Sequence, residues 1–215
     1  MKLFDSFGMN PRTIRFYLLE KGIDIPRQEV DILGAENRQA DYLQLNPAGQ
    51  TPALELDDGR VISETYAICE YLEEKYPAPS LIGTTPEERA ETRMWWRRAE
   101  LNICVPMVLG FYYAEGYDLF KTRIRCLPEA ADGMKQRAQD GLMWMDGLMA
   151  DRPWIAGGRF TIADICLYCY VDQLEGANQK LPAEAANMIR WRDATRARAA
   201  APASVWREQP MGMRG

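Results

Sequence analysis

The twenty residues from Asn46 to Thr65, NPAGQTPALELDDGRVISET, constrain the fold more than any other part of the chain. They begin with a loop rich in Pro and Gly. Two short apolar segments follow, joined by Asp58-Gly59, a pair typical of a tight hairpin turn. The stretch therefore predicts a β-hairpin that leads directly into a helix.

The loop before this hairpin has the chemistry of a peptide-binding edge. Thr51-Pro52 precedes the apolar run 53–56, and proline gives a sheet no N–H, so it belongs at the first strand residue or at an exposed turn. If the bond is cis, the loop turns sharply and leaves backbone groups free to pair with an extended ligand. At the other end, Glu64-Thr65 begins a helix whose unpaired N–H groups favour a carboxylate. The two ends together predict a site for a small extended peptide.

The order of elements in residues 1–77 predicts a thioredoxin-like domain. The expected strands are 2–4, 28–32 and the two of the hairpin, and the expected helices are 10–22, an irregular one at 37–45, and 66–76. Asn10 is the expected N-cap of the first helix, with Pro11 at its first position and Gly22 as its stop. In a thioredoxin-like domain a parallel βαβ unit precedes a hairpin and a final helix, which is this order.

The second part of the chain is expected to be all-helical. Residues 78–86 read as a linker, because the sequence there is rich in Pro, Gly, Ser and Thr. Apolar residues then recur at helical spacing in 87–115, 131–150, 162–176 and 183–199, so 87–202 is the predicted helical domain and 203–215 a tail. Pro106 should kink the longest helix. Thr161 and Asp164 form a predicted capping box, with Phe160 and Ile165 as its hydrophobic staple.

Composition excludes several classes of function. The chain has no histidine, which removes Ser-His and Cys-His nucleophile activation and the commonest metal ligand, so no metal site is expected. The net charge of −5 is spread along the chain, which argues against nucleic acid as a partner. No apolar run is long enough to span a membrane and no signal segment is recognised, so a cytoplasmic location is predicted. The five cysteines are an odd number and read as free thiols.

These features together resemble a cytosolic glutathione transferase. NPAGQTPALELDD is similar to the signature loop of that family, and the opening NPRTIRFYLLEKGI resembles a bacterial and fungal group within it. The resemblance covers nearly the whole chain. It implies a glutathione transferase fold, glutathione as co-substrate and a homodimer.

The resemblance also implies which residues bind glutathione. The backbone of Thr51, before Pro52, would pair with the cysteinyl part, and Glu64 and Thr65 would hold the γ-glutamyl end. The glycyl carboxylate would be reached by Gln50, Asn37 and Arg38.

The first turn departs from the family pattern. Family members place a Ser, Thr, Tyr or Cys near the end of the first strand, and here that position falls on Gly8. Asn10 aligns with an asparagine that touches the thiol in one family class, although a slip of one residue would make Met9 or Pro11 the match. Asn10 is therefore the predicted catalytic residue, with Ser6 or a backbone group as alternatives and a purely capping role as the rival interpretation.

The predicted activity is conjugation of the glutathione thiolate to a hydrophobic electrophile. Val108, Tyr112 and Tyr113 are expected to line the pocket for that electrophile, or else to be core. A glutathione-dependent lyase, isomerase or dehalogenase is an alternative, as is a non-catalytic module that uses the fold for protein contact.

Two conspicuous motifs are expected to be structural. Cys166 and Cys169 have CxxC spacing but lie inside a predicted helix with no second pair, so a buried, inert pair is predicted. Trp95-Trp96 is expected to be core or a subunit contact.

Overall fold

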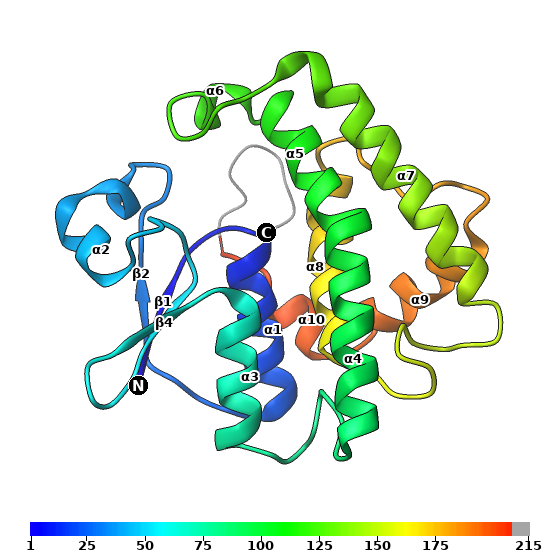
Figure 1. The fold of residues 1–215 in the computed structure, drawn as a ribbon, viewed down its shortest axis with the longest axis horizontal. Helices are drawn as coiled ribbons and strands as arrows, with labels where there is room; N and C mark the ends of the chain where they lie inside the picture. The colour runs from blue at the N-terminus through cyan, green and yellow to red at the C-terminus, as the bar shows by residue number, and fades with distance from the viewer. Residues whose placement is uncertain (208–215) are drawn as a thin grey trace.

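The computed structural model describes residues 1–207, which form a sheet-containing part and a helical part packed side by side (Figure 1). The first part holds β1 (Lys2–Asp5), α1 (Met9–Lys21), β2 (Arg27–Glu29), η1 (Glu36–Arg38), α2 (Ala40–Leu45), β3 (Ala53–Glu55), β4 (Val61–Ser63) and α3 (Thr65–Lys75). The expected irregular helix at 37–45 is thus two short helices, and the expected strand at 28–32 is shorter and begins one residue earlier.

The sheet has the strand order β2-β1-β3-β4, with β1 parallel to β2 and antiparallel to β3. Successive side chains of a strand point to opposite faces. Leu3 and Leu54 accordingly join the core under α1 and α3, whereas Phe4 and Ala53 pack with Tyr42 of α2. Figure 1 shows α1 and α3 on one side of the sheet and α2 on the other. The predicted thioredoxin-like arrangement is confirmed.

The first helix begins earlier than the sequence pattern predicts. Gly8 is its N-cap, with a φ of 134° that favours glycine, and Asn10 is the second helical residue and makes no cap. The N-cap prediction was therefore wrong, because the glycine lets the chain turn out of its extended path two residues before the asparagine. The expected stop is present, since Gly22 closes the helix in the left-handed conformation.

The second part is built from helices. They are α4 (Pro86–Ala99), η2 (Glu100–Cys104), α5 (Val105–Tyr113), α6 (Tyr117–Phe120), η3 (Pro128–Ala130), α7 (Ala131–Leu148), α8 (Ile162–Glu175), α9 (Ala186–Arg196) and α10 (Ala200–Ala203). α8 runs through the middle of the bundle, and every residue from Ile162 to Leu174 is buried. Within residues 1–207, no helix combines the length and apolar character needed to cross a membrane.

The longest predicted helix is interrupted just before Pro106. Residues 100–104 form a wider, π-helical turn. Proline has no N–H for the carbonyl of Asn102, four residues back, and its ring crowds that carbonyl. Gly141 of α7 approaches the same carbonyl so closely that a Cβ there would lie 2.4 Å from it. A glycine is required at this contact.

Two helices of this part begin with capping boxes. The predicted one joins Thr161 and Asp164, and burial raises the pKa of Asp164 to about 6 although four hydrogen bonds lower it. The second joins Thr85 and Glu88, so α4 begins at Pro86, inside the expected linker.

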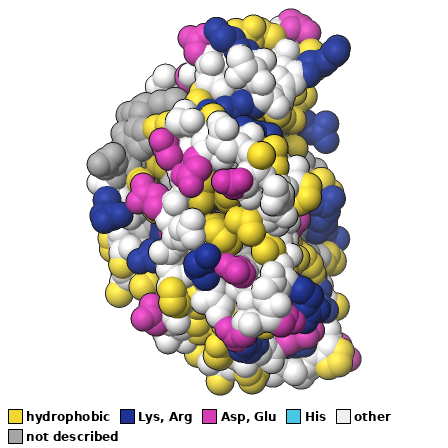
Figure 2. All heavy atoms as spheres, turned by 90° about the vertical axis from the view of Figure 1, so that its left-hand side faces the viewer, with side chains coloured by type: hydrophobic (Ala, Val, Ile, Leu, Met, Phe, Trp, Pro, Cys, Tyr) yellow, Lys and Arg dark blue, Asp and Glu magenta, His cyan; other side chains and the backbone are white. Residues whose placement is uncertain are grey.

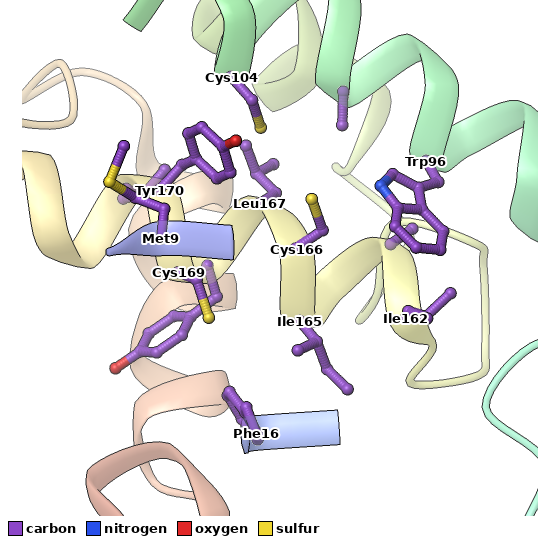
Figure 3. Packing of buried hydrophobic residues seen from close by; sticks show 14 of the residues in the cluster. Met9, Phe16, Trp96, Cys104, Ile162, Ile165, Cys166, Leu167, Cys169 and Tyr170 are labelled. Atoms are coloured by element: carbon purple, nitrogen blue, oxygen red, sulfur yellow. The ribbon is translucent and has the colours of Figure 1, made fainter. Parts of the chain in front are cut away.

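α1 and α8 join the two parts. In Figure 3, Phe16 of α1 faces Ile165 of α8, and Met9 lies beside Tyr170. A buried ion pair at 2.9 Å links Arg12 to Asp172 across the same contact.

Two structural predictions concern buried or terminal residues. Cys166 and Cys169 are buried, and burial raises the pKa of the Cys169 thiol to about 11. The expected tail from residue 203 begins inside packed structure, because Ser204 is fully buried and its carbonyl accepts a hydrogen bond from Arg15 at 2.8 Å. The rest of the tail, 208–215, lies outside the described residues.

Candidate functional site

A cavity of about 340 Å³ lies between the two parts. Its walls come from the first turn, the loop that ends at Thr51, the segment from η2 to residue 124, and α8. Seven of the predicted site residues line it, namely Asn10, Asn37, Arg38, Gln50, Thr51, Val108 and Tyr112. The other four, Pro52, Glu64, Thr65 and Tyr113, do not.

The first turn brings a helix N-terminus to the cavity. Gly8, Met9, Asn10 and Pro11 all line it. α1 has no acidic residue in its first turn and no side-chain cap, and its first backbone hydrogen bond runs from Arg12 N–H to the Gly8 carbonyl at 3.0 Å. Within residues 1–207 the N–H groups of Met9 and Asn10 therefore have no partner and can bind an anion.

The Asn10 side chain is oriented by the helical part. Its Oδ1 accepts a hydrogen bond of 2.9 Å from the hydroxyl of Tyr170 on α8. Burial raises the pKa of Tyr170 well above its ordinary value, so the hydroxyl stays protonated and donates. With Oδ1 engaged, Nδ2 remains the free donor of the amide among residues 1–207. Sequence reasoning missed Tyr170, which lies 160 residues from Asn10 and belongs to no motif.

The alternative hydroxyl in the first turn is already engaged. Ser6 is buried and does not line the cavity. Its Oγ donates to the carbonyl of Phe7 at 3.1 Å and is hydrogen-bonded to the hydroxyl of Thr51. Gly8, the position that the resemblance aligns with the family's hydroxyl, lines the cavity but carries no side chain.

The loop from Asn46 to Thr51 is held by amide and phenol groups of its own domain. Asn46 Nδ2 and the Tyr42 hydroxyl both donate to the carbonyl of Gln50, at 2.8 and 2.7 Å. Asn37 Nδ2 donates to the carbonyl of Gly49 at 2.7 Å. Asn37 thus supports the loop, and its buried Oδ1 is left without a partner in the described chain.

Thr51 ends this loop with unpaired backbone groups. The Thr51–Pro52 bond is cis. Neither the N–H nor the C=O of Thr51 is hydrogen-bonded to any of residues 1–207. Such groups are what an extended peptide uses when it adds to the edge of a sheet.

Glu64 and Thr65 lie at the same end of the hairpin as this loop. The β3–β4 register pairs Ala53 with Ser63, which places the residue after Ser63 next to the chain that leaves Pro52. Glu64 is exposed, is the N-cap of α3 and has a φ of 72°, a conformation that L-residues rarely adopt and that clusters at functional sites. The Glu64 carboxylate lies outside the cavity, at the end of the hairpin where the chain leaves Thr51 and Pro52.

The opposite wall of the cavity is aromatic. Tyr112 stacks on Phe120 with ring centroids 3.7 Å apart, and Val108 and Phe111 lie beside them. Burial raises the pKa of Tyr112 to about 12, so it presents a neutral phenol. Sequence reasoning missed Phe120, which belongs to the short helix α6. Within residues 1–207 no three Cys, Asp or Glu side chains come together to hold a metal ion.

Comparison with known proteins gives consistent matches along the chain. Residues 9–75 match the family described as "Glutathione S-transferase, N-terminal domain" and residues 128–208 match "Glutathione S-transferase, C-terminal domain". The chain is 31% identical to Glutathione S-transferase 2 of Saccharomyces cerevisiae over 170 residues, 77% of this chain and 72% of that protein. It is 32% identical to maleylacetoacetate isomerase of Pseudomonas aeruginosa over 186 residues, 83% of this chain and 82% of that protein.

A solved structure shows the same architecture. It is that of a glutathione S-transferase domain-containing protein from Marinobacter aquaeolei, with a TM-score of 0.88 and 34% identity, covering 94% of this chain and 100% of that one.

Proposed function

The chain belongs to the glutathione S-transferase family, and we propose that it conjugates the thiolate of glutathione to a hydrophobic electrophile. The observation that carries the proposal is the first turn, where an unneutralised helix N-terminus and the Asn10 amide converge on the cavity. The aromatic wall lies across the same cavity, where an apolar electrophile would be held. From the family resemblance, the proposal includes a homodimer in the cytoplasm.

In this proposal, one set of residues binds glutathione and another activates its thiol. The free backbone of Thr51 pairs with the cysteinyl part of glutathione, and Glu64 and Thr65 hold the γ-glutamyl amine end. Gln50 and Arg38 reach the glycyl carboxylate, while Asn37 keeps the loop in place. The thiol of a peptide held this way points to the first turn.

Modest electrostatics are sufficient to form the thiolate. A free thiol titrates near about 8.5, so lowering its pKa by one to two units, roughly 1.4 kcal/mol each, populates the anion at neutral pH. A helix N-terminus contributes about 0.3 to 1 kcal/mol when exposed and up to about 2 when partly buried. One amide hydrogen bond to the anion adds a comparable amount. Asn10 with α1 therefore replaces the hydroxyl that Gly8 lacks.

Glutathione binding and a turnover screen test the proposal together. We expect binding at millimolar glutathione or below, measured by calorimetry, and turnover with at least one class among aryl halides, enones, epoxides and hydroperoxides. Binding without any conjugation would favour a glutathione-dependent isomerase, lyase or dehalogenase. The likeness to maleylacetoacetate isomerase makes isomerisation of maleylacetoacetate the first of these to assay. Failure to bind glutathione would leave a protein-interaction module as the better account.

A further inference from the structure

Two arginines reach the cavity from opposite sides of the cleft. Arg38 ends η1 in the sheet-containing part, and Arg123 follows α6 in the helical part; both line the cavity. Arg123 reaches the other part of the molecule, since its Nη2 is 3.5 Å from the carbonyl oxygen of Leu33. On the face shown in Figure 2, Lys and Arg side chains lie below the uppermost lobe, which is at the height of α6 in Figure 1.

Neither arginine has an ion-pair partner within residues 1–207. Other inward-facing arginines are paired, for example Arg12 with Asp172 at 2.9 Å and Arg15 with Asp5 at 2.7 Å. The Nε of Arg38 is buried and has no hydrogen-bond partner in this part of the chain. A buried donor without a partner is costly, which makes an external acceptor favourable.

The nearby carboxylates are engaged elsewhere. Glu100 lines the cavity but is hydrogen-bonded to Arg97 at 2.7 Å. Asp31 is close enough to raise the pKa of Arg123, yet it accepts the Gly34 N–H at 2.8 Å and makes no ion pair with that arginine. The pKa of Arg123 lies below its ordinary value, first because of burial and then because of repulsion from Arg38. An anion between the two guanidinium groups would relieve this repulsion.

The aromatic wall adjoins the same charge. The Arg123 guanidinium lies 6.0 Å from the centroid of Phe120, the ring that stacks on Tyr112. A guanidinium group can donate two parallel hydrogen bonds to a carboxylate, and the neighbouring aromatic ring can pack against the planar group that carries it.

We infer that Arg38 and Arg123 form one carboxylate-binding site that spans the cleft. Given the proposed function, two ligands can supply the carboxylate: the glycyl end of glutathione, or an acidic group on an aromatic electrophile. In either case Arg123 is a binding residue contributed by the helical part, so a ligand carboxylate draws the two parts together.

The test compares Arg123→Gln with Arg125→Gln, a matched loss of charge two residues away at an exposed position that does not line the cavity. Arg123→Lys keeps the positive charge but loses the planar guanidinium group that can donate two parallel hydrogen bonds. In the first arm, calorimetry measures binding of glutathione and of its glycyl monoethyl ester, which lacks the carboxylate.

In the second arm, the electrophiles are 4-chloro-3,5-dinitrobenzoate and its methyl ester. The thiolate sulfur forms a C–S bond at the chlorinated carbon, chloride leaves with the C–Cl electron pair, and the thiol proton goes to water. Binding of the benzoate is also titrated without glutathione, so this arm gives a result whether or not turnover occurs.

If the site holds the glycyl end, Arg123→Gln weakens glutathione binding at least tenfold and leaves the ester unchanged. If it holds an acidic electrophile, the same substitution raises the KM or Kd of the benzoate at least tenfold and leaves the methyl ester unchanged. Arg123→Lys should recover part of either loss. Equal behaviour of Arg123→Gln and Arg125→Gln in both arms overturns the inference. The proposed function fails on a different result, namely absence of glutathione binding by the unsubstituted protein.

Discussion

The loop from Asn46 to Thr51 and the first turn face the same cavity but are held in different ways. The loop is fixed by side chains of its own domain, with Tyr42 and Asn46 both bonded to the Gln50 carbonyl. In the first turn, by contrast, the Asn10 amide is oriented by a hydrogen bond from Tyr170 of the helical part.

This difference suggests that glutathione binding and thiol reactivity depend on different parts of the molecule. In the proposed function, glutathione binding depends mainly on residues between 37 and 65, so it should tolerate changes in the helical part other than at Arg123. In the same proposal, the reactivity of the thiol depends on the contact between Asn10 and Tyr170, so it should be sensitive to changes in the helical part. Substitutions on either side test this separation.

The largest effect is expected from Asn10→Ala. It removes the amide that is proposed to donate to the thiolate, so conjugation should slow tenfold or more while glutathione affinity stays nearly unchanged. Steady-state kinetics and calorimetry measure the two quantities. Gln136→Ala, which removes an exposed amide outside the cavity, is the control. Unaltered turnover in Asn10→Ala would remove this residue from the mechanism.

Glu64→Gln should give the opposite pattern. The carboxylate is proposed to bind the γ-glutamyl ammonium group, and a charged hydrogen bond of this kind contributes about 1.5 kcal/mol or more. We expect the Kd for glutathione to rise about tenfold and kcat at saturation to stay within twofold. A fall in kcat with unchanged affinity contradicts the assignment of this region to binding.

Tyr170→Phe tests the contact between domains. It keeps the ring but removes the hydroxyl, which frees the Asn10 amide to rotate, so kcat should fall about three- to fivefold. The pKa of bound glutathione, followed by thiolate absorbance, should rise. In the Asn10→Ala background the same substitution should change neither. A further loss there would show that Tyr170 acts on the thiol directly.

Gly8→Ser is expected to have the smallest effect on activity. The space is adequate, since a Cβ would meet Pro11 Cδ at 3.5 Å, but the φ of 134° is strained for serine. We expect a loss of about 1 kcal/mol in unfolding free energy and no gain in rate. Thermal unfolding measures the first, with Gly22→Ser, also at positive φ but outside the cavity, as control. A clear gain in rate would show that the missing hydroxyl limits this protein.

The sequence predicted best what short-range chemistry decides. Thr51-Pro52, the Asp58-Gly59 hairpin and the Thr161 capping box are each specified by neighbouring residues. The N-cap of α1 was misplaced, because the pattern Asn-Pro is also compatible with a helix that has already begun. The Thr85 capping box was hidden by the linker composition around it.

The long-range parts of the site could not be predicted. Tyr170 meets Asn10 only because α1 packs on α8, and Arg123 reaches Leu33 across 90 residues. No short sequence motif predicts either contact. The sequence therefore predicted the loop and hairpin of the candidate site better than the long-range contacts that complete it.

The π-helical turn η2 sets which side chains of the following helix, α5, point to the cavity. Each residue of an α-helix advances its direction by about 100°, so a turn with extra residues rotates everything beyond it. Glu100, the first residue of this turn, and Val105 and Val108 after it all line the cavity. Replacing Pro106, which is buried and does not line the cavity, would let that turn tighten. The wall would then present other side chains, so substrate range can change without any substitution at a lining residue.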